Sequence, residues 1–224
     1  MKTVKLILVI LMTSLAASSF AQLTKEQQKE RKEMLKASKK ELESKASKVA
    51  RKEAKALAKE GWKAAPGALP LEKQLDRSYM MQMEYSADMF PKYIMGEAQS
   101  IGQNYDAAKM QASELAKLQL AGKIQTEVTA LIDNTVANKQ LDPEEAASVV
   151  QSVQASKNLI SQSIGRIITV VEAYRTLPNK HKEVRVMIAY NQAMAKQAAK
   201  EAIKQDLEKK GEELHKKLDE LLGW

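Results

Sequence analysis

The chain has 224 residues, a formal net charge of +8 and no cysteine. The lack of cysteine excludes a disulfide framework and also the lipid-bearing cysteine of an anchored envelope lipoprotein. About 200 residues remain after the leader described next, which is enough for one domain of normal size and an extension, so the fold can depend on an ordinary hydrophobic core.

The first residues predict a cleavable secretory signal. Lys2 and Lys5 precede a mostly apolar run over residues 6–15, and small residues in Ser19-Phe20-Ala21 occupy the two positions that a signal peptidase recognises. The run is too short for the roughly twenty residues of a membrane-spanning helix. We expect cleavage after Ala21 and export to the periplasm or outer membrane, with a buried N-terminal core helix as the alternative.

A basic segment follows the leader. Between Leu23 and Glu60 there are thirteen Lys and Arg residues against seven Asp and Glu, and no Gly or Pro. Strong helix formers dominate it, and Thr24 with Gln27 makes a capping-box pattern, so we predict a long and mostly solvated helix. Its apolar stripe at heptad spacing is thin, because the companion seam is largely polar. The stripe consists of Leu35, Leu42, Val49 and Ala56.

Three interpretations of this basic helix are open. It is a solvated helix held by salt bridges, or it attaches electrostatically to anionic lipid headgroups, lipopolysaccharide phosphates or cell-wall polymers. Nucleic acid is the least favoured partner, because export removes the usual substrate and no aromatic residues are interleaved with the lysines for base stacking.

Gly61 and Pro66 break the helical pattern and mark the clearest boundary in the chain. A short helix is expected over residues 71–87. Its second half belongs to a soft apolar stretch, which either binds another protein or covers the edge of a core. The stretch comprises Trp62, Tyr79, Met80, Met81, Met83, Tyr85, Met89 and Phe90.

The rest of the chain alternates between strand and helix patterns. Alternating and β-branched residues predict strands over residues 92–98, 167–174 and 184–190, the last two joined as a hairpin through a turn at residues 177–180. For residues 167–174 a buried helix is the alternative. Helices are expected from Asn104 to Asn134, from Asp142 with its proline and capping-box glutamate to about Ser163, and from Asn191 to Leu222.

These elements predict an α+β fold, in which long helices pack on one face of a small antiparallel sheet of about three strands. The predicted organisation is a signal peptide over residues 1–21, a charged basic helix over 22–61, an α+β domain over 62–203 and a charged C-terminal helix extension over 204–224. The two charged helices also offer a route to a homo-oligomer.

The region from Pro91 to Ile203 resembles the Lpp-type twenty-kilodalton lipoprotein domain of bacterial envelopes, in a variant without the lipid-bearing cysteine. The similarity consists of a strand ending in Gly96-Glu97-Ala98, an alanine-spaced helix with the step from Leu120-Ala121 to Ile124, and a closing hairpin. The resemblance implies an exported, non-enzymatic α+β domain and carries over no catalytic residues.

No catalytic, cofactor-binding or metal-binding residue is predicted. The chain has only two histidines, His181 in a predicted turn and His215 in a charged helix, and no cysteine to complete a zinc site. Glycine-rich phosphate loops are absent. We therefore expect a non-catalytic envelope protein with a binding or structural role. The alternatives are a self-assembling helical protein and a cell-wall or glycan hydrolase with paired carboxylates, for which Glu144 with Glu145, or Asp219 with Glu220, are the candidates.

Overall fold

The computed structural model describes residues 25–87, 89–137 and 143–209. The predicted signal peptide, the predicted helix caps at Thr24 and Asp142, and the predicted extension from residue 210 onward lie outside the described residues. The chain divides into two units, residues 1–45 and residues 46–224, which are described separately.

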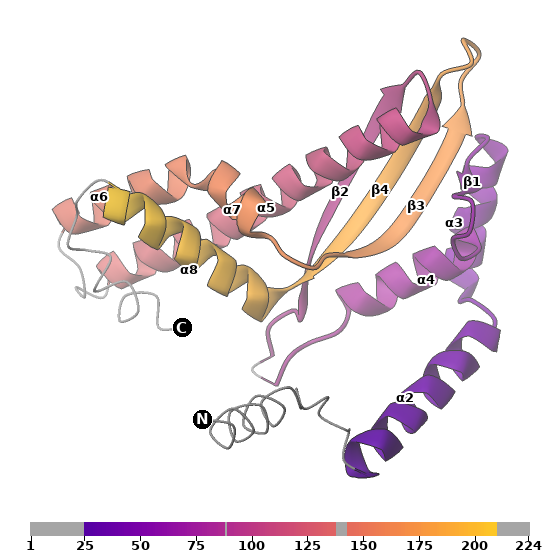
Figure 1. The fold of residues 1–224 in the computed structure, drawn as a ribbon, viewed down its shortest axis with the longest axis horizontal. Helices are drawn as coiled ribbons and strands as arrows, with labels where there is room; N and C mark the ends of the chain where they lie inside the picture. Colours follow the sequence, from indigo (N-terminus) through magenta and orange to yellow (C-terminus); the bar gives the residue numbers. More distant parts are fainter. Residues whose placement is uncertain (1–24, 88, 138–142, 210–224) are drawn as a thin grey trace, which may run out of the picture. The chain divides into compact units, whose positions relative to one another are not determined.

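The described part of the first unit is the helix α2 (Lys25–Glu43), drawn in indigo in Figure 1. Its apolar side chains Met34 and Leu35 are exposed. Lys39 and Glu43, one turn apart, form an ion pair at 3.9 Å. The helix therefore has the solvated character expected from its sequence.

The second unit contains a four-stranded antiparallel sheet in the order β1-β3-β4-β2, which confirms the predicted α+β class. The predicted hairpin forms, because β3 and β4 pair across the turn at residues 177–181, and β2 pairs with β4. The fourth strand, β1, is too short to show an alternating pattern in the sequence. The strands are β1 (Lys63–Ala64), β2 (Tyr93–Gly102), β3 (Ile168–Thr176) and β4 (Lys182–Asn191).

One face of the sheet is covered by the long helix α5 (Tyr105–Ala137). Asn104 caps this helix as predicted, since its side-chain oxygen accepts a hydrogen bond from the backbone N–H of Ala107 at 2.9 Å. Small residues on the buried side let α5 approach the strands closely. They include Ala108, Ala112 and Ala116, which are fully buried.

The second half of α5 packs against three further helices (Figure 1). They are α6 (Pro143–Ala155), α7 (Lys157–Ser163) and α8 (Gln192–Lys209). The single helix expected up to Ser163 is interrupted at Ser156, whose hydroxyl donates to the backbone oxygen of Ser152. This helical layer shares one core with the α5 face of the sheet, and its largest fully buried side chains include Leu120, Ile124, Ile160, Ile203 and Leu207.

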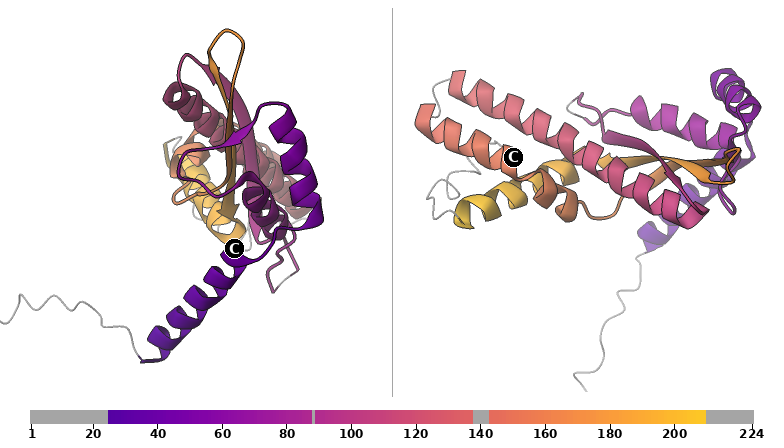
Figure 2. Two further views of the ribbon diagram at one scale, coloured as in Figure 1. Left: turned by 90° about the vertical axis from the view of Figure 1, so that its right-hand side faces the viewer. Right: turned by 90° about the horizontal axis from the view of Figure 1, so that it is seen from above.

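The opposite face of the sheet carries α3 (Lys48–Lys59) and α4 (Leu71–Gln82), as the side view of Figure 2 shows. The expectation that helices cover only one face is therefore wrong. The reason is visible in β4, where Val186 and Ile188 face α5 while Met187 and Ala189 join the core under α4. A strand that is apolar on both faces has to be covered on both.

The basic segment is also two helices instead of the single helix predicted over residues 24–60. Residues 44–47 leave the helical conformation, and Ser47 caps α3 by accepting a hydrogen bond from the N–H of Ala50 at 3.2 Å. Its own N–H donates to the carboxylate of Asp76 on α4, at 3.1 Å. A serine cap with a tertiary partner therefore outweighs the helix propensity of the surrounding lysines.

Candidate functional site

Helix α3 packs on α4 through alanines. Ala46, Ala50 and Ala54 are buried, and Leu57 is partly buried beside them. These positions are three or four residues apart, so they form one face of the helix. The apolar stripe predicted from the sequence is not part of this packed face, because Val49 is 65% exposed in α3 and Leu35 is 63% exposed in α2. The alanine face, and not the stripe of larger residues, attaches α3 to α4, which in turn packs on the sheet.

A second face of α3 is cationic. Lys48, Arg51, Lys52 and Lys55 recur at spacings of three and four residues and are all exposed. Within the part of the chain that the structure describes, none of the four lies within ion-pair distance of a carboxylate. The only acidic residue within α3, Glu53, instead accepts a hydrogen bond from the hydroxyl of Tyr79.

This cationic face borders a groove of about 670 Å³ between α3 and the start of α4, which we call the basic groove. Its apolar floor is made by Ala54, Ala58, Trp62 and Leu71, and its rim by Lys48, Arg51, Lys52, Lys55 and Glu72. Four cations therefore stand against one carboxylate around an apolar surface. The positive charges all come from α3, and the carboxylate belongs to the first turn of α4.

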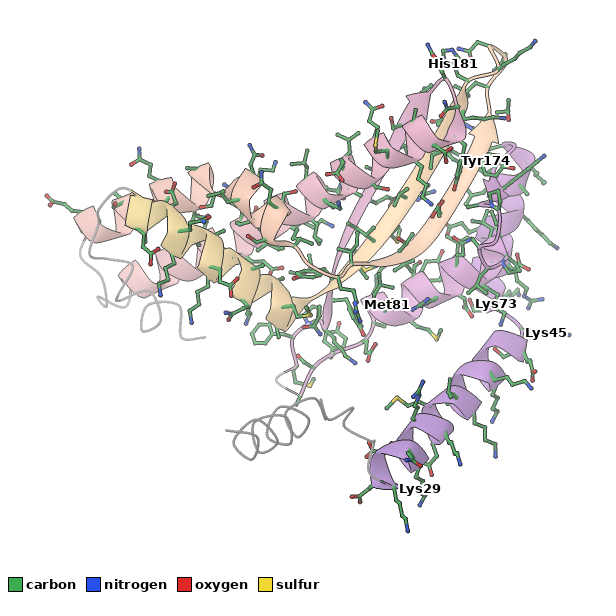
Figure 3. The ribbon with its side chains drawn as sticks, in the orientation of Figure 1. Lys29, Lys45, Lys73, Met81, Tyr174 and His181 are labelled. Atoms are coloured by element: carbon green, nitrogen blue, oxygen red, sulfur yellow. The ribbon has the colours of Figure 1, made fainter. Side chains whose placement is uncertain are left out.

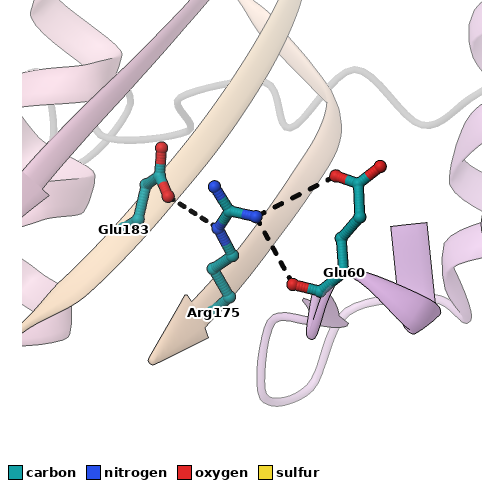
Figure 4. Close-up of polar contacts among 3 residues, drawn as sticks. All are labelled: Glu60, Arg175 and Glu183. Carbon is teal, nitrogen blue, oxygen red and sulfur yellow. Dashed lines mark hydrogen bonds and ion pairs between the residues drawn. The ribbon is translucent and has the colours of Figure 1, made fainter. Parts of the chain in front are cut away.

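Trp62, in the floor of the groove, is held firmly. It is 4% exposed, and its backbone N–H donates to the oxygen of Leu57 at 3.0 Å. The guanidinium of Arg175 lies 4.7 Å from the centre of its ring. Arg175 is itself fixed by Glu183 at 2.6 Å and by the backbone oxygen of Glu60 at 3.4 Å (Figure 4). The end of α3 and the floor of the groove are thus tied to β3 and β4.

The chemistry available at the basic groove is that of binding. The rim offers ammonium and guanidinium groups for anions, and the floor offers apolar surface. Its lining contains no serine, threonine, cysteine or histidine. In the described residues no group of three or more His, Asp or Glu side chains is arranged to hold a metal ion.

Of the candidate residues for chemistry that the structure describes, His181 and Glu144 lie on different elements. His181 lies in the turn between β3 and β4, at the tip of the hairpin (Figure 3). Its backbone N–H donates to the side-chain oxygen of Asn179 at 3.1 Å. Glu144 is exposed in the first turn of α6. His215, Asp219 and Glu220 lie outside the described residues.

Part of the soft apolar stretch is buried in a core, and part is exposed. Trp62 and Met81 are buried in the core under α4, but most of the other members are exposed. Phe90 and Pro91 border a smaller hollow of about 280 Å³ with Ile124 and Val128 of α5. The exposed members are Met80, Met83, Tyr85, Met89 and Phe90.

A partly buried polar cluster lies between α5 and β3. The hydroxyl of Tyr105 donates to the carboxylate of Glu172, and Lys109 pairs with the same carboxylate at 2.8 Å. The pKa of Tyr105 is raised above its usual range, mainly by burial and secondly by this hydrogen bond. The ring also packs edge-on against Tyr174, with centroids 5.4 Å apart. The cluster fastens the start of α5 to the sheet.

Sequence reasoning identified the basic segment but not the groove. The missed signal is the series Ala46, Ala50, Ala54 and Leu57, which has helical spacing and marks the packed face of α3. Once that face is assigned, the cations of α3 fall beside it. The contribution of Trp62 and Leu71 had no local signal, because a Pro- and Gly-containing turn separates them.

Comparison with known proteins found no matching family model, no matching curated protein and no matching solved structure. The resemblance to the Lpp-type lipoprotein domain therefore stays a prediction. None of the helices in the described ranges combines the length and apolar character that crossing a membrane requires. The class that the structure itself defines is an α+β domain with a basic groove on one of its helices.

Proposed function

We propose that this is a non-catalytic, exported cell-envelope protein that binds an anionic envelope surface through the cationic face of α3. The observation that carries the proposal is the set of four exposed cations, Lys48, Arg51, Lys52 and Lys55, which have no carboxylate partner in the described part of the chain. Support for export comes from the order of charge, apolar run and small residues in the first 21 positions.

The arrangement of these cations is costly in the absence of a partner. Lys48 with Lys52 and Arg51 with Lys55 are like-charge pairs one turn apart, and each such pair destabilises a helix by about 0.2–0.5 kcal/mol. Close to an anionic surface, the same four charges contribute a favourable binding energy. Each basic residue close to such a surface contributes about 1 kcal/mol, so four cations correspond to roughly a thousandfold in affinity.

Vesicle co-sedimentation tests the proposal on the mature chain. A variant with all four cations replaced by glutamine (K48Q, R51Q, K52Q, K55Q) should lose most of its binding to vesicles rich in phosphatidylglycerol. Wild-type binding should weaken steeply from low to physiological salt, because exposed charges are screened over about 8 Å. Neutral phosphatidylcholine vesicles should sediment neither protein.

The matched control removes four exposed cations elsewhere, through K157Q, R166Q, K180Q and K204Q. It has the same net charge as the α3 variant and should keep most of the wild-type binding. Equal loss in both variants would mean that only net charge matters, and the α3 face would then have no special role. The export part is checked separately by N-terminal sequencing of the cell-derived protein, which should begin at Gln22.

A further inference from the structure

The basic groove also has an apolar floor, and a site that only collects negative charge has no use for one. Ala54, Ala58, Trp62 and Leu71 line the groove together with the rim cations of α3. We propose that the groove binds a single acidic phospholipid, with its phosphate at the α3 rim and the first methylene groups of its acyl chains on the floor. This inference rests on the proposed function and names the ligand that the cationic face binds.

Charge complementarity favours a ligand with one anionic end. The α3 side of the groove carries Lys48, Arg51, Lys52 and Lys55, but the α4 side carries Glu72. A polyanion lying across the groove would meet that carboxylate and be repelled. A lipid places its single phosphate on the cationic side and its hydrocarbon on the apolar lining that includes Leu71, so no second anion comes close to Glu72.

The size and rigidity of the groove fit such a ligand. Its volume of about 670 Å³ lies within the range of small-molecule binding sites. Arg175 and the backbone of Leu57 hold Trp62 in place before any ligand arrives, so little ordering is left to be done on binding. The groove is open to solvent along its length, which leaves room for the remainder of the acyl chains to stay in the membrane.

The test uses soluble ligands that separate charge from hydrocarbon. Short-chain phosphatidylglycerol, kept below its micelle-forming concentration, is compared with two other ligands. Glycerol phosphate has no acyl chains and up to about twice the phosphate charge, and short-chain phosphatidylcholine has the acyl chains without the net charge. Affinities are measured by calorimetry on the mature chain, and an acidic peptide of equal charge is included. Short-chain phosphatidylglycerol should bind at least about tenfold more tightly than glycerol phosphate and the acidic peptide, the effect of burying roughly two methylene groups. It should also bind at least about tenfold more tightly than short-chain phosphatidylcholine, because only the acidic lipid brings a net negative charge to the rim cations.

The deciding variant is A58F, which fills the floor and keeps every cation. Ala58 is exposed, so the substitution leaves the core under α4 intact. A58F should lose the tenfold preference for the lipid but still co-sediment with anionic vesicles. A130F, at an exposed alanine of α5, is the control and should bind like the wild type.

The outcomes separate the two proposals. If glycerol phosphate or the acidic peptide binds the wild type as tightly as the short-chain lipid, or if A58F keeps the preference, the lipid inference is overturned while the surface-binding function stands. If the α3 glutamine variant still sediments with anionic vesicles as the wild type does, the proposed function itself fails.

Discussion

Gly96 in β2 lies directly against the backbone of α5, and replacing it with alanine tests that contact. A Cβ atom built at Gly96 would lie 2.5 Å from the backbone oxygen of Ala116 and 3.1 Å from the Cβ of Leu120, both on α5. Ordinary carbon–oxygen contacts begin near about 3.3 Å. Accommodating the methyl group therefore requires α5 to move away from β2 by roughly 0.8 Å.

The energetic cost follows from what the methyl group meets. Overpacking a core costs about 1–3 kcal/mol, and the upper end applies here because the obstacle is helix backbone and not the end of a flexible side chain. Removing a glycine from a strand interior returns about 0.5–1 kcal/mol. We expect G96A to lower the free energy of unfolding by about 2 kcal/mol, which corresponds to a melting temperature lower by roughly 4–8 °C.

Thermal unfolding followed by circular dichroism measures this effect against two glycine-to-alanine controls. G165A should be near neutral, because the nearest atom to its new Cβ is the hydroxyl of Tyr190 at 4.0 Å. G122A lies inside α5 and meets only the mobile end of Lys157, so it should stabilise the protein by up to about 1 kcal/mol through helix propensity. A G96A protein that melts at or above the wild-type temperature would show that the inferred closeness of β2 and α5 is wrong.

Two further predictions concern the removal of the N-terminal helices and the polar cluster around Tyr105. A chain starting at Ala46 should melt within about 2 °C of the mature protein. A chain starting at Gly61 lacks the alanine face of α3 and so loses about 3 kcal/mol of apolar burial, and it should melt roughly 6–12 °C lower. Equal melting temperatures of these two chains would show that α3 contributes no core. Because the folded-state pKa of Tyr105 is raised above its ordinary value of 10.0, its stabilising contribution is complete below pH 10 and is lost as the pH rises further. The free energy of unfolding in urea should therefore fall above pH 10 more for the wild type than for Y105F, and identical pH profiles would exclude the tyrosine as the cause.

The sequence was sufficient for elements with strong local signals. The alternation of Val184, Val186 and Ile188 identified β4, and Asn104 identified the start of α5, because both depend on neighbours within a few residues. That helices cover the second face of the sheet could not be predicted from such local signals. Met187 and Ala189 are compatible with either a solvated or a buried face, and only the position of α4 decides between them.

The packed face of α3 was not predicted, and the reason is different. Ranking residues by hydrophobicity selects Val49 over Ala50, yet Val49 is exposed and Ala50 is fully buried. Close approach between α3 and α4 depends on small side chains, so the relevant property is size and not apolar area. The groove could not be predicted at all, since its floor joins Ala58 to Leu71 across a turn whose geometry the sequence does not specify.

The two faces of α3 make attachment and binding separable. The alanine face holds the helix to α4, so the cations on the neighbouring face are presented at fixed positions. Because glutamine keeps a helix solvated as well as lysine or arginine does, the four glutamine substitutions remove like-charge repulsion without exposing apolar surface. The α3 glutamine variant should then be at least as stable as the wild type in thermal melts, even though it has lost its binding to anionic vesicles. A variant that unfolds at a lower temperature would show that these cations stabilise the fold. A stable variant with weak binding would instead mean that the repulsion is retained for an anionic ligand, as expected when stability is given up for function.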